Sequence, residues 1–310
     1  MGRQQLGDTV YLAHVICDPR TPVTAVGSST AATQWSPVRD EQRFAREYFT
    51  RLEGEATTML QTRFSPPLAA AGIEHELLLL RLKVHMSAAG IGEAICSKAR
   101  DLGADLVVIV SHGAGVLAEY GSVARWCTDH SGVPVLLVPP SILGSGQPQA
   151  PSNCIVVAGA GNMEGLHAAF DFAVSKLAKP GDNIYLVHAE QWGSGNAEDG
   201  PAVELRKQLL AAAGKWQHHS EDSCAPLVNV AVDVIAHESS PEEGMQGGAG
   251  AQICTYAQDF NARCVVLVHH GRRSMMRELQ YGSITAHCSK YCPRPLVVFD
   301  AEESLAAMSR

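Results

Sequence analysis

The chain has no excess of basic residues: 24 Lys and Arg face 32 Asp and Glu over 310 residues, for a formal net charge of −8. Nucleic acids and anionic membranes select basic surfaces, so we expect neither as the main partner. No apolar run approaches the roughly 18–20 residues of a membrane span, and the N-terminus lacks the basic-then-apolar pattern of a secretory signal. These absences predict a cytoplasmic protein.

Spaced metal ligands and known catalytic motifs are also missing. The nine cysteines are scattered, without a CxxC pair or a zinc-type Cys/His set. His218-His219 and His269-His270 have no spaced third ligand, so we expect polar surface histidines there. We expect the cysteines to be buried packing residues, as free cysteines usually are. The sequence contains neither a G-x-S-x-G turn nor a G-x4-G-K-[ST] loop.

What the chain does contain is an internal repeat. The stretch ICSKARDLGADLVVIVSHG from Ile95 matches ICTYAQDFNARCVVLVHHG from Ile253, with every pair 158 residues apart. Gly103 is replaced by Asn261, and these two residue types best tolerate the left-handed conformation that ends a helix. Each copy therefore predicts a helix, a left-handed cap, a buried strand and a glycine turn, and two copies predict two homologous domains.

The elements around the repeat also correspond. Gly7–His14 matches Gly181–His188, and each copy continues with a helical pattern, a strand, the Ile-Cys helix, a Val-rich strand, a helix and a last strand. Helices alternating with short apolar strands indicate α/β sheets that are mostly parallel and covered on both faces. We predict domains at 1–140 and 153–301, a Pro/Gly/Ser-rich linker at 141–152 and a tail at 302–310.

The first copy is shorter at its start. In the second copy 28 residues, from Asn153 to Pro180, precede Gly181 and contain a strand and a helix, whereas six residues precede Gly7. Our hypothesis is that the chain as given lacks an N-terminal piece. Two alternatives stay open: the strands on either side of the gap pair directly, or another segment fills it.

The order of elements resembles the universal stress protein family, in a tandem two-domain form. The resemblance covers nearly the whole chain and implies two doubly wound, mostly parallel five-stranded sheets of the Rossmann-like, adenine-nucleotide α-hydrolase-like type, the first copy lacking its first strand and helix. The family signature is a turn G-x2-G-x9-G-[S/T] after the fourth strand, whose amides and hydroxyl hold the phosphates of ATP. Helix N-termini and glycine turns bind anions for general physical reasons.

Both copies carry a version of this turn. The residues that match, and that the resemblance implies as nucleotide contacts, are Gly113, Gly121 and Ser122 in the first copy and Gly271, Gly282 and Ser283 in the second, with Arg272 adding charge. Val110 and Val268 replace the first glycine, and the spacing is two residues short in copy one and one residue long in copy two. Ala160 stands where the family has an acidic nucleoside contact. The alternative to a phosphate site is an inherited helix start capped by Ser283.

The resemblance implies a non-catalytic stress-response protein with a degenerate ATP or AMP site, retained in the second domain rather than the first, and no metal beyond one accompanying nucleotide. Two alternatives stay open: a ligand-free interaction module that binds an unknown protein partner, and, ranked last, an enzyme transferring an adenylyl or phosphoryl group. Family members commonly dimerise through their last strands, so we expect Val135–Val138 to run antiparallel to Leu296–Phe299 as an internal pseudo-dimer that covers two sheet edges.

Overall fold

The structure, a computed structural model, describes residues 9–17, 38–82, 87–110, 122–144, 152–159, 163–192, 206–208, 210–211, 214, 228–238, 248–269 and 284–300. The chain divides into two compact units, Met1–Lys98 and Ala99–Arg310, which we call unit 1 and unit 2. The boundary falls within helix α3 (Ala88–Asp101).

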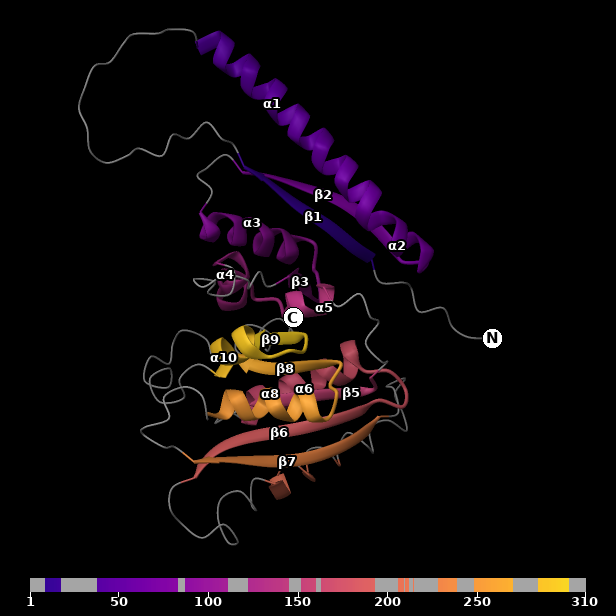
Figure 1. Ribbon diagram of the computed structural model, residues 1–310, viewed down its shortest axis with the longest axis vertical. Coiled ribbons are helices and arrows are strands. Elements are labelled where there is room, and N and C mark those ends of the chain that lie inside the picture. Colours follow the sequence, from indigo (N-terminus) through magenta and orange to yellow (C-terminus); the bar gives the residue numbers. More distant parts are fainter. Residues whose placement is uncertain are drawn as a thin grey trace, which may run out of the picture. The chain divides into compact units, whose positions relative to one another are not determined.

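Unit 1 contains a two-stranded parallel sheet and one long helical segment (Figure 1). Its elements before α3 are β1 (Thr9–Cys17), α1 (Val38–Met59), the π-helical turn η1 (Leu60–Phe64), α2 (Ser65–Ala70) and β2 (Glu74–Leu82). β1 and β2 pair along their whole length, from Thr9 opposite Glu74 to Cys17 opposite Leu82. The buried hydrophobic side chains in the described part of this unit are Ile16, Ala56, Leu60 and Cys96. Because a two-stranded sheet is marginally stable by itself, so small a core gives unit 1 little stability of its own.

Unit 2 holds a seven-stranded sheet in the order β3-β4-β9-β8-β5-β6-β7. Its strands are β3 (Val107–Val110), β4 (Val135–Val138), β5 (Cys154–Gly159), β6 (Asn183–Trp192), β7 (Asn229–Glu238), β8 (Cys264–His269) and β9 (Leu296–Asp300). All neighbouring strands are parallel except β4 and β9, which are antiparallel. All six residues of β5 are buried, as expected for a central strand covered on both faces.

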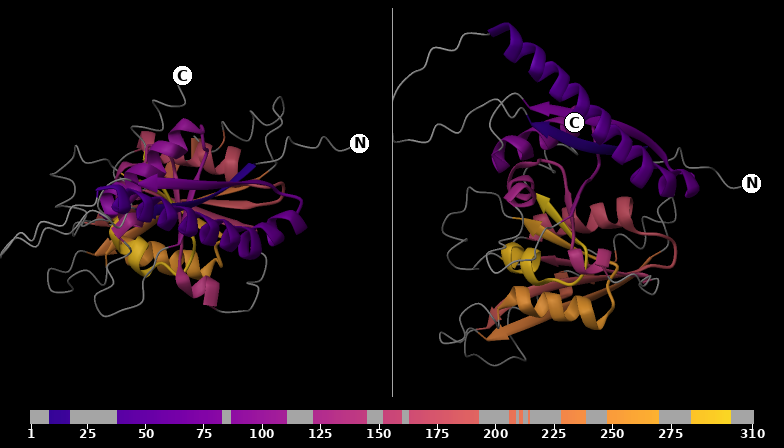
Figure 2. Two further views of the ribbon diagram at one scale, coloured as in Figure 1. Left: turned by 90° about the horizontal axis from the view of Figure 1, so that it is seen from above. Right: turned by 45° about the horizontal axis from the view of Figure 1, so that its top comes forward.

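Helices cover both faces of this sheet (Figures 1 and 2). Those of unit 2 after α3 are α4 (Ser122–His130), α5 (Pro140–Gly144), α6 (Met163–Phe172) with its π-helical continuation η2 (Ala173–Leu177), α8 (Ala249–Asp259) and α10 (Ile284–Tyr291). Leu166 of α6 packs in one buried cluster with Val157 and Val266, so α6 lies on the face to which these valines point. We call it the α6 face.

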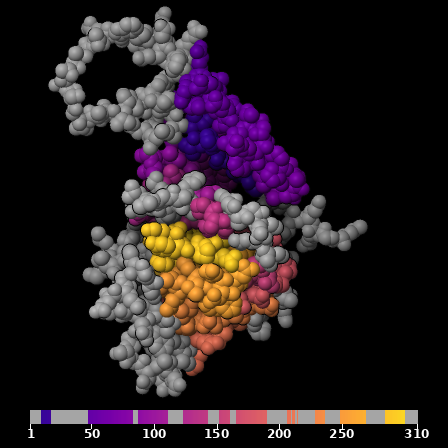
Figure 3. All heavy atoms as spheres, in the orientation of Figure 1, coloured from indigo at the N-terminus to yellow at the C-terminus, as the bar shows by residue number. Residues whose placement is uncertain are grey.

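The opposite face is covered by α8 and α10, which lie side by side (Figure 3). Tyr185 of β6 contacts Tyr256 of α8 and Phe260, the residue that follows α8, with ring centroids 6.1 and 4.5 Å apart. A Cβ atom at Gly250 would stand 2.9 Å from Cβ of His287, a distance that side chains do not adopt. Glycine at this position therefore permits the close approach of the two helices.

The predicted repeat geometry is confirmed. Gly103 has φ +62° and Asn261 has φ +47°, so both occupy the left-handed cap position. The next residue closes the same hydrogen bond in each copy, from Ala104 N to Ala99 O at 2.9 Å and from Ala262 N to Ala257 O at 2.8 Å. The sequence repeat is thus a repeat of backbone structure.

The predicted antiparallel pairing of Val135–Val138 with Leu296–Phe299 is also confirmed, since Val135 aligns with Val298 and Leu137 with Leu296. The pairing makes the last two strands of the first copy part of the sheet of the second. The α/β fold class is as predicted, but the strands form a seven-stranded and a two-stranded sheet instead of two sheets of up to five strands. The domain boundaries at 1–140 and 153–301 stay a prediction.

The gap in the first copy is visible in the strand pairing. Within unit 1 β1 pairs with β2, and within unit 2 β3 pairs with β4. The second copy joins the strands that correspond to β1 and β3, namely β6 and β8, through β5. The three explanations for the gap in the first copy stay hypotheses.

Candidate functional site

The strand order of unit 2 reverses direction between β5 and β8. From β5 the chain adds β6 and then β7 on one side, and it places β8 and β9 on the other. Ala158 near the end of β5 lies opposite Leu267 near the end of β8. In open α/β sheets ligands bind outside the carboxyl ends of the strands at such a reversal, because the connecting turns diverge there and leave a crevice.

Two helices begin at this edge of the sheet. β8 ends at His269 and α10 begins at Ile284, while β5 ends at Gly159 and α6 begins at Met163. Helix N-termini carry unpaired N–H groups and the positive end of the helix dipole, which favour an anion. The edge therefore has the framework of an anion site.

The predicted contact residues fall mainly in the connections that follow β8 and β3. Gly271, Arg272, Gly282 and Ser283 lie outside the described residues, in the connection from β8 to α10, and Gly113 and Gly121 lie outside them in the connection from β3 to α4. Ser122 is the first residue of α4. Ala160 follows β5 and lies outside the described residues too, as do His218, His219 and His270. The structure thus fixes where the two turns begin and end, and their contacts stay a prediction.

The corresponding edge in the first copy is built differently. The connection that carries Gly113 and Gly121 leaves β3 and enters α4, as its counterpart leaves β8 and enters α10. β8 has β5 beside it, but β3 has β4 on one side and no described strand on the other. The described first copy therefore has no strand-order reversal at its glycine turn.

His188 is a buried residue near the site that the sequence analysis did not single out. It lies opposite Gly159, the last residue of β5, and its side chain is 5% exposed. Burial lowers the pKa of its imidazole, which favours the neutral ring. Its Nδ1 is buried without a hydrogen-bond partner among the described residues. The one signal in the sequence was its recurrence at the repeat position of His14.

Asp171 on α6 is a second perturbed group. Burial raises the pKa of its carboxyl to about 6. One of its oxygens, Oδ1, and Nε2 of His167, one helical turn earlier, are buried without a partner among the described residues. Both groups lie on α6, the helix that follows β5. With a pKa of about 6, the carboxyl of Asp171 changes charge mainly within about one pH unit of that value.

Seven of the cysteines are packing residues, as predicted. They are free and buried: Cys96, Cys127, Cys154, Cys254, Cys264, Cys288 and Cys292. Burial raises the pKa of Cys154 to about 11 and that of Cys264 to about 12, so both thiols are poor nucleophiles. No group of three or more His, Cys, Asp or Glu that could hold a metal ion occurs among the described residues.

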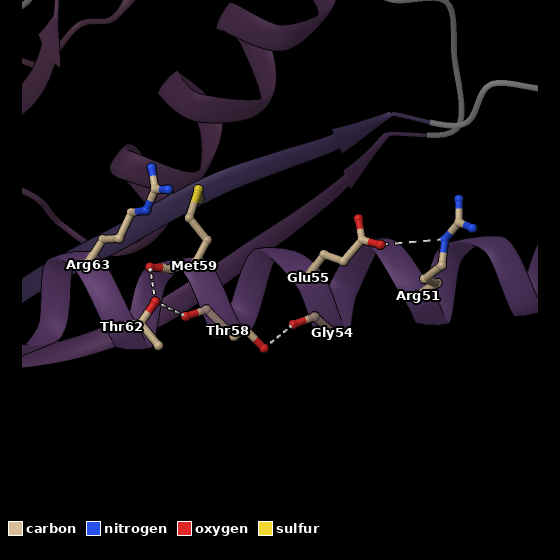
Figure 4. A pocket seen from close by; sticks show the side chains of 7 residues that line it. All are labelled: Arg51, Gly54, Glu55, Thr58, Met59, Thr62 and Arg63. Carbon is tan, nitrogen blue, oxygen red and sulfur yellow. Dashed lines mark hydrogen bonds and ion pairs between the residues drawn. The ribbon is translucent and has the colours of Figure 1, made fainter.

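A surface depression in unit 1 is not a candidate site. It runs along α1 and η1 and is lined by Arg51, Gly54, Glu55, Thr58, Met59, Thr62 and Arg63 (Figure 4). The lining comes from one continuous helical stretch, and its threonines donate to backbone oxygens of the same helix: Thr58 Oγ1 to Gly54 O at 2.8 Å and Thr62 Oγ1 to Thr58 O at 2.7 Å. Small-molecule sites are concave and surround the ligand, and one helix cannot do so.

Within the described residues, no helix has the length and apolarity to cross a membrane.

Known proteins match the chain in both halves. The sequence model of the universal stress protein family matches residues 3–139 and again residues 154–300. A universal stress protein from Archaeoglobus fulgidus is 15% identical and matches 94% of this chain and 86% of its own with a TM-score of 0.52. A proposed universal stress protein from Pseudomonas aeruginosa is 12% identical and matches 98% of this chain and 96% of its own with a TM-score of 0.51.

These two structures show the fold alone, because their identities are low. A universal stress protein family protein from Arabidopsis thaliana with AMP bound is 17% identical and matches 48% of this chain and 92% of its own, but its TM-score of 0.29 is too low to place that ligand here. No curated protein matches the chain.

Proposed function

The chain belongs to the universal stress protein family through both of its halves, and we propose that it is a non-catalytic stress-response protein that binds an adenine nucleotide, ATP or AMP, in its second half. One observation carries the proposal. The turn with Gly271, Gly282 and Ser283 connects the end of β8 to the start of α10, at the point where the strand order reverses. Sequence motif and sheet topology therefore select the same edge.

The chemistry proposed for the turn is phosphate binding. Backbone N–H groups near Gly271 and Gly282 and the hydroxyl of Ser283 would donate to phosphate oxygens, and Arg272 would add positive charge. A carboxylate is missing at Ala160, where the family contacts the nucleoside. Since one helix-dipole contact contributes only about 0.3–1 kcal/mol, we expect weak binding, with Mg²⁺ entering only together with the nucleotide.

We propose a single site per chain. The turn with Gly113, Gly121 and Ser122 follows β3, which has no described strand in the position that β5 takes beside β8. In the second half the end of β5 borders the crevice on the side where the nucleoside would lie. The first half has no described strand end in that position. We therefore assign nucleotide binding to the second half alone.

The test is a calorimetric titration of ATP, and separately of AMP, into the full chain and into matched variants of the two turns. We expect saturable binding that Gly282→Val abolishes and Gly121→Val leaves unchanged. Ser283→Ala should weaken binding about 10–100-fold, the loss of one charge-assisted hydrogen bond of roughly 1.5–3 kcal/mol. No binding at millimolar nucleotide, or an equal loss in both glycine variants, would overturn the proposal.

An interaction module without nucleotide is the second candidate, and Val108 favours it. This apolar side chain is 60% exposed on β3, an edge strand of the described sheet, and edge strands can pair with another polypeptide. The titration separates the two candidates. An adenylyl- or phosphoryl-transferring enzyme ranks third and would require nucleotide turnover that Ser283→Ala removes.

A further inference from the structure

One row of side chains runs across the entire sheet of unit 2. The strand registers align, from the β3 edge to the β7 edge, Val108, Leu136, Val297, Val266, Val157, Leu186 and Val232. Residues aligned in this way point to the same face of a sheet, and here that face is the α6 face. The row is therefore apolar from one edge of the sheet to the other.

Burial along the row ends abruptly at β3. Val297, Val266 and Val157 are 0% exposed, Leu136 is partly buried, and Val108 is 60% exposed. On the opposite face the same strand is covered, since the neighbouring Val107 is 8% exposed. The exposure thus belongs to one face of β3.

The repeat shows how the same position is covered in the second half. Val108 corresponds to Val266, which lies opposite Val157 of β5 and packs in one cluster with Leu166 of α6. The strand and helix that do this, β5 and α6, are the two elements for which the first copy has no described counterpart. The open face of β3 is therefore the face that β5 and α6 cover on β8.

The backbone of β3 is open on the same side. Val107 donates its N–H to Pro134 O at 2.9 Å, as Val265 donates to Pro295 O at 2.8 Å. Successive N–H groups of a strand point to opposite sides, so the N–H of Val108 points away from β4, as that of Val266 points towards β5. Edge strands of this kind add a further strand when a partner supplies one.

We propose that the edge and α6 face of β3 bind a polypeptide segment of β5–α6 chemistry. This occupant is a run of about six apolar residues that pairs in parallel with β3, then a glycine, a short turn and an amphipathic helix that covers Val108 and Leu136. The second half supplies the reasons for each part. All six residues of β5 are buried, and a Cβ atom at Gly159 would stand 3.2 Å from Cδ1 of Leu166, so glycine at the end of the strand lets the helix pack closely. The helix contributes Leu166, Ala169 and Phe170 to the core.

The experiment supplies that segment to the full chain. Residues 152–180 are repeated ahead of Met1 through a flexible Gly/Ser linker of about 20 residues. A control carries Val156→Pro in the added copy, which removes a ladder hydrogen bond. We expect the amide of Val108 to exchange with deuterium about tenfold more slowly or better in the fusion, and the proline control to match the parent chain. Equal exchange in all three proteins overturns the proposal.

A second measurement separates this occupant from a second copy of the chain. Sedimentation equilibrium is run on the parent chain and on Val108→Lys, a change that an exposed side chain tolerates. The proposal expects no dimer that depends on Val108 and expects Val108→Lys to abolish the protection seen in the fusion. A parent dimer that Val108→Lys dissociates overturns the proposal in favour of β3 pairing with β3 of another copy. The nucleotide titrations are independent of both results.

Discussion

Removing Asp182 should destabilise unit 2 strongly, because this carboxylate partners a half-buried arginine. Asp182 and Arg263 precede β6 and β8, and their side chains are 6% and 31% exposed. Nη2 of Arg263 lies 2.8 Å from Oδ2 and Nη1 lies 3.3 Å from Oδ1. The carboxylate also accepts the N–H of Lys179 at 2.7 Å, and the guanidinium donates to Leu177 O at 2.8 Å.

The magnitude follows from this geometry. Breaking a fully buried pair costs about 3–5 kcal/mol, whereas a surface pair contributes about 0–1 kcal/mol. Asp182 is nearly buried and Arg263 is partly solvated, so we expect about 3 kcal/mol for Asp182→Ala. Asp182→Asn keeps an acceptor for Lys179 and should cost about half as much.

The assay is urea unfolding followed by far-ultraviolet circular dichroism, with the midpoints compared at equal slope. The control is Glu55→Ala, which removes an exposed pair with Arg51 whose side chains are 64% and 66% exposed. That change should cost less than about 0.5 kcal/mol. If Asp182→Ala costs no more than the control, the ion pair does not stabilise the sheet and the reasoning is wrong.

Four further predictions concern the core and its titratable groups. Val266→Ala should cost about 2–3 kcal/mol of unfolding free energy, from two buried methyl groups and a cavity, whereas Val108→Ala should cost under about 0.5 kcal/mol; equal urea midpoints would contradict this. Asp171 holds a raised pKa of about 6 when folded, so it costs stability at neutral pH and that cost fades as pH falls from 6 to 4. Asp171→Asn should therefore raise the melting temperature at pH 7.5 and lose the gain at pH 4. The effect of His188 on stability has the opposite pH dependence. Because burial lowers its pKa, stability falls as the pH drops below about 6.5. His188→Gln should remove this low-pH loss from a profile of melting temperature against pH. Cys264, whose pKa burial raises to about 12, should react with iodoacetamide only at the rate of unfolding; rapid native labelling would refute its burial.

The local features of the fold could be predicted from the sequence, because they depend on residues that are close together or repeated. The caps at Gly103 and Asn261 follow from residue type. The pairing of β4 with β9 followed from the resemblance and from the need to cover two edges. Each of these rests on a signal that a single stretch of sequence carries.

Features that depend on contacts between residues far apart in the chain could not be predicted from the sequence. The missing counterpart of β5 was visible in the sequence as a difference in length between the two copies. The strand pairing of the first copy was not visible: β1 pairs with β2, and β3 pairs with β4. His188 looked like an ordinary strand residue in the sequence, and only the structure shows that it is buried and lies opposite Gly159. The glycine turns were found by motif, and only the sheet order distinguishes the edge at β8 from the edge at β3.

The number of ATP molecules bound per chain, measured by equilibrium dialysis of the full-length protein at saturating nucleotide, tests the proposed site most directly. The account predicts one per chain, because the reversal of strand order beside a glycine turn occurs once in the described sheets. Two per chain would contradict the assignment to the second half, and none would leave the family fold without its nucleotide.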